Sequence, residues 1–246
     1  MARSDRRVAD DNVAAPPREI GLRPRFRVLL FALAAVSGWL DGVAFIVLGN
    51  VFVSVVTGNF VILGLAVSEQ DWELLGRVLI VVATNAAGVV AGAVIVRARG
   101  LEAWRIGPRP VLAAELVVLV GVALAWTIAG EPSGDGVHVL LYLAPITFAM
   151  GMQAALVAHL DVPAVQVNYV SGLFTSMASL LAARLTHRGA PRVGVPGWVF
   201  ATIVGCYVVA ALGLGLLHTR GAVLMWIPAL AIAGALAITW RTNDDD

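Results

Sequence analysis

The sequence predicts an all-α polytopic membrane protein with about six transmembrane helices and two interrupted or re-entrant segments. The 246-residue chain has 59% hydrophobic residues, 13% charged residues and a mean hydropathy of +0.87. A chain of this length cannot bury so many apolar side chains in one water-soluble core. Six apolar stretches reach the roughly 20 residues that a helix needs to cross a bilayer: residues 28–48, 77–97, 110–129, 138–158, 198–218 and 222–240.

The first of these stretches follows a polar tail, residues 1–27, in which arginines alternate with acidic residues and prolines. We expect this tail to be disordered and to lie in the cytoplasm, because positive charge accumulates on that side. The apolar run after it is too long for a signal peptide, so we expect an uncleaved first span. A single membrane domain, residues 28–240, then precedes a second cytoplasmic tail, residues 241–246.

Two further apolar stretches, residues 51–68 and 165–183, carry a glycine beside small polar residues in their middle. The backbone groups that such an interruption frees must be satisfied inside the protein, because lipid offers no partner. If both stretches crossed, the arginine-rich loop 97–109 would lie outside, against the positive-inside rule. We therefore expect both stretches to enter the bilayer and to return on the same side.

The two halves of the membrane domain, residues 28–129 and 138–240, have the same order of elements. Each half has three predicted crossings, an odd number, so the second half is expected to be inverted relative to the first. A 3+3 inverted repeat with broken helices is a recurring transporter architecture. Two unrelated hydrophobic halves remain the alternative.

Asp41 is the most informative single residue, because it lies about thirteen residues into the first predicted span. A carboxylate at that depth costs roughly 2.5–3.5 kcal/mol or more, so it is expected to face a cavity or a partner. Asp41 is our candidate for a proton- or cation-coupling carboxylate. The alternative is a structural role, in which it caps a half-helix or binds another helix by hydrogen bonds.

The turn Thr57-Gly58-Asn59 is expected at the start of a returning half-helix. Thr57 and Asn59 could cap the free N–H groups there, and Gly58 permits a positive φ. Exposed N–H groups at a helix start attract anions or dipoles. The turn is therefore a candidate substrate contact, with a tightly packed helix break as the alternative.

Neutral polar residues and one further turn complete the candidate pathway: Asn85, Gln153, Asn168, Ser171 and Gly172. Each could line a pathway or make an interhelical hydrogen bond. Gly88 and Gly92 predict close helix packing. Glu115 is expected to be a paired or snorkelling charge near the membrane boundary, with a coupling site as the alternative.

Composition and motifs also exclude several functions. A net charge of +1 indicates no nucleic-acid partner, and the single cysteine, Cys206, excludes a disulfide scaffold and a cysteine-rich zinc site. The chain has no hydrolase, metalloprotease or phosphate-loop motif, and its four histidines do not pair at metal-ligand spacing. We therefore expect no enzyme activity, no metal and no cofactor.

Three sequence runs resemble the YoaK-like family of bacterial integral membrane proteins. They are Gly38-Trp39-Leu40-Asp41-Gly42, then Thr57-Gly58-Asn59 with Leu63-Gly64, and Gly151-Met152-Gln153-Ala154. The resemblance covers roughly residues 28–240 and implies a multi-pass protein of the bacterial cytoplasmic membrane. The distribution of arginines predicts that both termini lie in the cytoplasm. It brings no established biochemical activity.

Three classes of function therefore compete: a secondary transporter of a small solute, a passive small-solute channel, and a non-transporting membrane scaffold. We favour the transporter, because it accounts for the interrupted segments and the buried Asp41 together. The expected partners are the lipid bilayer and an unidentified small solute, and a homo-oligomer remains open.

Overall fold

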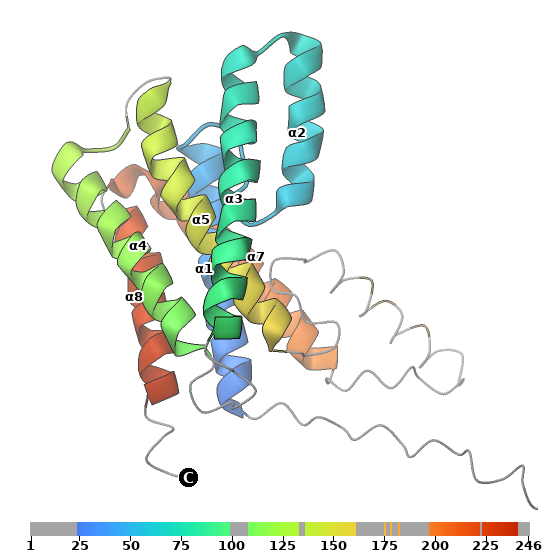
Figure 1. Cartoon of the computed structure of the whole chain (residues 1–246), viewed down its shortest axis with the longest axis vertical. Coiled ribbons are helices and arrows are strands. Elements are labelled where there is room, and N and C mark those ends of the chain that lie inside the picture. The colour runs from blue at the N-terminus through green and yellow to red at the C-terminus, as the bar shows by residue number, and fades with distance from the viewer. Residues whose placement is uncertain are drawn as a thin grey trace, which may run out of the picture.

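The computed structural model describes residues 24–98, 108–132, 136–160, 197–221 and 223–240, together with three isolated helical positions, 175, 178 and 182. Within these residues the chain has seven α-helices and no strand (Figure 1). They are α1 (Pro24–Ile46), α2 (Val56–Glu69), α3 (Trp72–Ala98), α4 (Arg109–Ala129), α5 (Val137–His159), α7 (Gly197–Leu217) and α8 (Val223–Trp240), with a short 3-10 helix, η1 (His218–Arg220), between the last two.

Six of these helices, all except α2, are long and apolar enough to cross a membrane, which confirms the six predicted spans. Two of them begin several residues earlier than predicted. Helix α1 starts at Pro24, within the predicted tail, where the fixed φ of proline suits a first helical position. Helix α3 starts at Trp72, five residues before the predicted boundary at 77.

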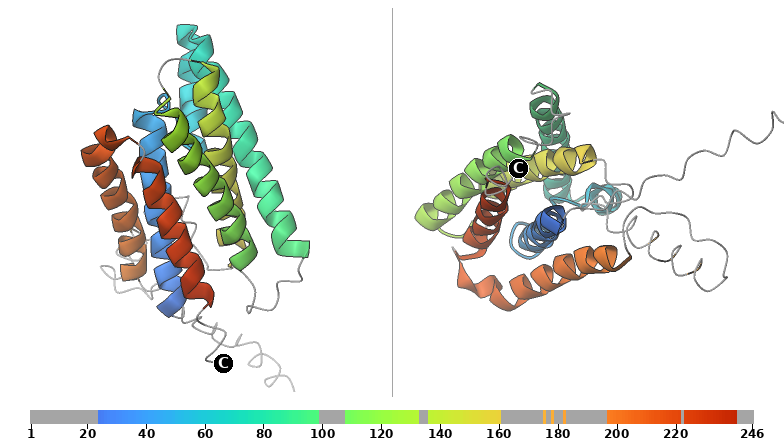
Figure 2. Two further views of the ribbon diagram at one scale, coloured as in Figure 1. Left: turned by 90° about the vertical axis from the view of Figure 1, so that its left-hand side faces the viewer. Right: turned by 90° about the horizontal axis from the view of Figure 1, so that it is seen from below.

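Helices α1 and α5 form the centre of the bundle. In each of them 67% of the most apolar window is buried, against 22–39% in the other four spans. Helix α1 packs against α7 and α8, whereas α5 packs against α3 and α4, and α4 and α8 also contact each other (Figure 2). The indole N–H of Trp39 on α1 donates to the carbonyl oxygen of Leu224 on α8 at 2.7 Å.

Glycines permit the closest of these contacts. A Cβ on Gly38 of α1 would lie 2.8 Å from the carbonyl carbon of Tyr207 on α7. A Cβ on Gly88 of α3 would lie 2.9 Å from the carbonyl carbon of Phe148 on α5, and one on Gly92 would lie 2.9 Å from Met152. The predicted packing role of Gly88 and Gly92 is confirmed, because only a hydrogen fits at these positions.

The first interrupted segment, residues 51–68, does not form a crossing helix. Helix α1 ends at Ile46, and the chain turns through Gly49 and Asn50, both with positive φ. Residues 51–55 are not helical, and α2 then runs for 14 residues, or about 21 Å, less than the roughly 30 Å of a hydrocarbon core. Helix α2 packs against α3, and it ends toward the end of the bundle where α1 ends and α3 begins (Figure 1). This arrangement agrees with the predicted re-entrant segment.

The interruption itself lies earlier than the sequence indicated. Thr57, Gly58 and Asn59 lie at the start of α2, as expected for the returning half-helix, but the non-helical backbone, residues 51–55, precedes them. The second interrupted segment, residues 165–183, lies outside the described residues, apart from the three isolated positions.

Candidate functional site

The carboxylate of Asp41 lies inside the bundle, with only 2% of the residue exposed. Oxygen Oδ1 accepts hydrogen bonds from the backbone N–H groups of Val53 at 2.7 Å and Ser54 at 2.8 Å. Oxygen Oδ2 accepts from the hydroxyl of Ser54 and, at 2.7 Å, from the hydroxyl of Tyr207 on α7. The carboxylate therefore joins three parts of the molecule: α1, the non-helical segment before α2, and α7.

Two asparagines complete the hydrogen bonding of this non-helical segment. The side-chain oxygen of Asn59 accepts from the N–H of Phe52 at 2.9 Å, and its amide nitrogen donates to the carbonyl of Phe52 at 2.6 Å. Asn85 on α3 donates to the carbonyl of Val53 at 3.3 Å. Non-helical backbone at membrane depth is tolerated only where protein or water satisfies it, and here three side chains do so.

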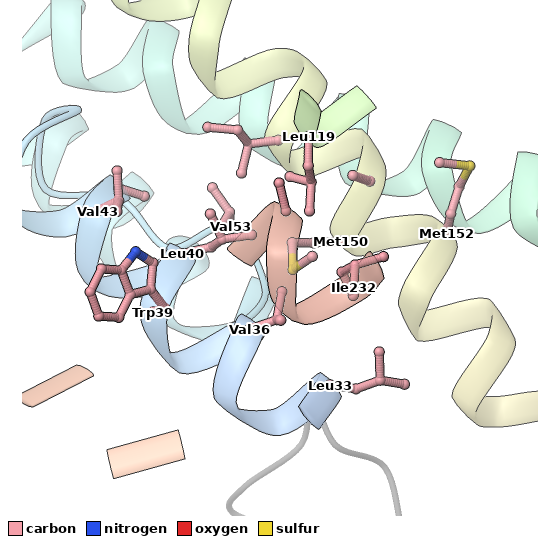
Figure 3. Close-up of a cluster of buried hydrophobic side chains, with 14 of the residues drawn as sticks. Leu33, Val36, Trp39, Leu40, Val43, Val53, Leu119, Met150, Met152 and Ile232 are labelled. Atoms are coloured by element: carbon pink, nitrogen blue, oxygen red, sulfur yellow. The ribbon is translucent and has the colours of Figure 1, made fainter. Parts of the chain in front are cut away.

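Apolar side chains surround this polar junction. Val53 belongs to the same cluster of buried side chains as Leu40 and Val43 of α1, Met150 of α5 and Ile232 of α8 (Figure 3). Hydrogen bonds in such surroundings are stronger than in water, because the local dielectric is low. The junction is therefore a tightly held part of the bundle.

Gln153, another predicted candidate, lies at a second contact in the core. Its amide nitrogen donates to the hydroxyl of Ser37 at 2.9 Å and to the carbonyl of Leu33 at 3.3 Å, so it connects α5 with α1. Ser37 and Asp41 are four residues apart on α1, so they share one face of that helix. Gln153, on the other central helix α5, therefore binds the same face of α1 that carries Asp41, one helical turn away.

The remaining candidates do not meet at Asp41. Thr57 is exposed, and Gly58 packs against the ring of Phe52, 3.1 Å from the position of a Cβ. The expectation that Asn59 caps α2 is wrong, since its amide pairs with Phe52 and the N-cap residue, Val55, makes no capping hydrogen bond. Asn168, Ser171 and Gly172 lie outside the described residues.

Ser54 and Tyr207 are the two site residues that the sequence did not indicate. Ser54 is a small polar residue in an otherwise apolar run, and Tyr207 is separated from Asp41 by 166 positions. The signal that could have found Tyr207 is a hydroxyl in the middle of an apolar span, which needs a hydrogen-bond partner there.

Glu115 also differs from expectation. It is fully buried in α4, and within the described residues neither of its carboxyl oxygens has a hydrogen-bond partner. The expected snorkelling or paired charge at the membrane boundary is therefore wrong, because a snorkelling side chain would reach solvent. Among the described residues, no group of three His, Cys, Asp or Glu side chains could hold a metal ion.

Comparisons with known proteins agree with this architecture. The UPF0700 transmembrane protein YoaK of Bacillus subtilis (strain 168) is 25% identical over 215 residues, which cover 85% of this chain and 91% of that protein. No solved structure matches the chain significantly. The model of the family described as "Protein of unknown function (DUF1275)" matches residues 29–238. The chain is therefore an integral membrane protein that belongs to the DUF1275 family.

Proposed function

We propose that this protein is a secondary transporter of a small solute, in which Asp41 couples the movement of the solute to protons. The observation that carries the proposal is the buried carboxylate between α1, residues 53–54 and α7. Ionisable residues inside the membrane are costly, and they commonly mark ion pathways and proton relays.

The two oxygens of Asp41 are bound by donors of different kinds. The N–H groups of Val53 and Ser54 can only donate, so Oδ1 must stay an acceptor. The hydroxyls of Ser54 and Tyr207 can either donate or accept, so Oδ2 can carry a proton if one hydroxyl reverses. Protonation would therefore rearrange the hydrogen bonds that Oδ2 makes with the hydroxyls of Ser54 and Tyr207, and leave the Oδ1 bonds to residues 53–54 in place.

Paired glycine contacts support the 3+3 inverted repeat that this proposal includes. In one pair, a Cβ on Gly38 of α1 would collide with the carbonyl of Tyr207 on α7. In the other, a Cβ on Gly151 of α5 would collide with the carbonyl of Asn85 on α3. Gly151 follows Gly38 by 113 positions, and Tyr207 follows Asn85 by 122 positions.

A second pair of contacts has the same two offsets. One helical turn further along, Gly42 of α1 meets Leu214 of α7, and Ala155 of α5 meets Gly92 of α3. Ala155 again follows Gly42 by 113 positions, and Leu214 follows Gly92 by 122. Exchanging α1 with α5, α3 with α7 and α4 with α8 therefore maps these contacts onto each other, as a two-fold relation between the halves would.

At these offsets, equivalent positions in the two halves carry different residues, so the site is asymmetric. The position equivalent to Asp41 is Ala154, and the position equivalent to Tyr207 is Asn85. Under this relation the second half carries no carboxylate where the first half has Asp41. A transporter built in this way would have one coupling carboxylate at this junction for each chain.

A second candidate function, a membrane scaffold without transport, is favoured by the completeness of the hydrogen bonding. Asp41 accepts four hydrogen bonds, and together with Asn59 and Asn85 it binds the N–H groups of residues 52–54 and the carbonyls of Phe52 and Val53. Such an arrangement holds a fold whether or not anything moves through it. Transport assays must therefore separate a structural carboxylate from a coupling one.

The test uses Asp41→Asn in purified protein reconstituted into liposomes with an imposed proton gradient. The asparagine oxygen can still accept from Val53 and Ser54, while its NH₂ group donates to the two hydroxyls, as a protonated carboxyl would. We expect the wild type to accumulate at least one solute of a panel of sugars, amino acids and organic ions. Asp41→Asn should exchange that solute across the membrane but lose gradient-driven accumulation.

Glu69→Gln is the matched control, because it removes an exposed carboxylate at the end of α2. It should behave as the wild type. An Asp41→Asn protein that still concentrates the solute would eliminate the coupling role. Downhill flux that ignores the proton gradient would favour a channel, and folded wild type that moves nothing in the panel would favour the scaffold.

A further inference from the structure

A second carboxyl group, that of Glu115, lies inside the membrane part of the protein, and the function proposed above does not use it. Glu115 is fully buried in α4, about 9 Å along the helix from Arg109. Its neighbours on the same helical face are also buried and apolar: Val111, Leu112, Leu119 and Val122. The carboxyl group therefore lies on the face by which α4 packs into the bundle.

The described residues provide no hydrogen-bond partner for either oxygen of this carboxyl group. Asp41 is the opposite case, since four donors converge on its carboxylate. Protein structures hold an ionised carboxylate in a buried position when it is paired or hydrogen-bonded, and both compensations are missing at Glu115 in this part of the chain.

The charged and titratable groups on the helices packed against α4 lie elsewhere. Helix α3, which makes a smaller contact with α4, carries Glu73 and Arg77 as an ion pair near its start and an exposed Arg97 in its last turn. Helix α8 has no charged residue between Val223 and Trp240. On α4 itself, Arg109 donates to the carbonyl of Thr239, with its guanidinium also 5.7 Å from the ring of Trp240. The described part of α4 therefore provides no neighbouring cation that would favour an ionised Glu115.

Helix α5, the other main neighbour of α4, carries three titratable side chains at or near its ends. His138 and His159 are exposed, and Tyr142 makes an edge contact with Trp126, eleven positions beyond Glu115 on α4. The buried hydroxyl of Thr147 donates within its own helix, to the carbonyl of Leu143. No charge on α5 faces the middle of α4.

From these observations we propose that Glu115 is a second proton-binding site, which holds a proton inside the membrane between α4, α5 and α8. A carboxyl group with neither donor nor cation beside it avoids the desolvation cost of a charge by keeping its proton. The ligand is the proton itself. The site is distinct from Asp41 and does not depend on whether the protein transports a solute.

Infrared spectroscopy of the protein in lipid tests this directly, because a neutral carboxyl and an ionised carboxylate absorb at different frequencies. At neutral pH, Glu115→Gln should lose one neutral-carboxyl band that the wild type shows. Asp41→Asn should keep that band. The matched control Glu69→Gln, which removes an exposed carboxylate from a helix, should keep it too.

Loss of an ionised-carboxylate signal from Glu115→Gln, with the neutral band intact, would overturn the proposal. Glu115→Met provides a second readout, since an unpartnered neutral carboxyl has no bond to lose. Its unfolding temperature should equal or exceed that of the wild type. A clear fall in that temperature, or failure of both variants to fold, would show that Glu115 has an essential partner and would also overturn the proposal.

Discussion

At the scale of single residues, the polar side chains of this membrane protein meet the demands of its own backbone. Residues 52–54 lie outside any helix at membrane depth. Asp41, Asn59 and Asn85 bind their N–H groups and the carbonyls of Phe52 and Val53. An unsatisfied backbone group in hydrocarbon would cost several kcal/mol. The cost of burying the Asp41 carboxylate is therefore offset by hydrogen bonds from Val53 and Ser54, in the same segment that the carboxylate holds in place.

Asp41→Leu should destabilise the fold, whereas Asp41→Asn should be close to the wild type. Leucine leaves the N–H groups of Val53 and Ser54 without acceptors, at about 1–3 kcal/mol each. Thermal unfolding in detergent measures the difference, with Glu69→Leu as an exposed control. Equal stability of the leucine and asparagine variants would contradict this account of the junction.

Tyr207→Phe should lower the free energy of unfolding by about 1.5–3 kcal/mol, because it removes a hydrogen bond to a charged oxygen. The matched change Tyr142→Phe removes a hydroxyl that makes no hydrogen bond within the described residues, so it should have a smaller effect. Chemical denaturation of both variants under the same conditions gives the two free energies of unfolding to be compared. A larger loss of unfolding free energy for Tyr142→Phe than for Tyr207→Phe would argue against the hydrogen bond between Tyr207 on α7 and Asp41 on α1.

The sequence indicated part of this junction, for a physical reason. Asp41 stands out because a carboxylate in an apolar run must find partners. Its partners do not stand out, since Ser54 carries no charge and the hydrogen bond to Tyr207 spans 166 positions. Asn85 and Gln153 stand out as polar residues in spans, but both donate to backbone carbonyls, which every residue offers, and the hydroxyl partner of Gln153, Ser37, lies 116 positions away.

At the scale of elements, hydropathy predicted the six spans, and arginine distribution predicted that the segment at 51–68 returns. The start of α2 was not predictable in the same way, because tertiary hydrogen bonds decide it. Thr57-Gly58-Asn59 lies at the start of α2, as expected, but the non-helical residues precede it and do not include it. Asp41 and Asn59 instead hold residues 52–54 outside the helix.

Gly151→Ala should destabilise the contact between α3 and α5 by about 1–3 kcal/mol, the usual cost of overpacking. The new Cβ would lie 2.8 Å from the backbone nitrogen of Val89, which cannot move as a side chain can. The control is Gly234→Ala in α8, where a Cβ meets nothing within 4 Å. There the better helix propensity of alanine should leave stability unchanged or raise it slightly. Unfolding temperatures in detergent measure both, and equal effects would show that α3 and α5 pack less tightly than described.

At the scale of the whole molecule, α1 and α5 form the centre, and the sequence could not have identified them. All six spans are apolar, and lipid-facing and protein-facing side chains are chemically alike, so hydrophobic periodicity does not reveal which face packs. The glycines that bring α1 to α7 and α3 to α5 are visible in the sequence, but which helix each one contacts follows only from the assembled bundle.

The last prediction concerns the number of crossings. We expect α2 to be re-entrant and the arginine-rich loops to lie in the cytoplasm, which predicts that Gln70 and Glu131 are both on the outer side. If the segment before α3 crossed instead, both positions would lie in the cytoplasm. Single cysteines are introduced at these positions and at His159, in a background in which Cys206 is replaced by alanine. A membrane-impermeant maleimide should label the first two positions in intact cells, and should label His159 only after the membrane is opened. Labelling of Gln70 only in opened cells would show that α2 crosses, and the six-span architecture would then be wrong.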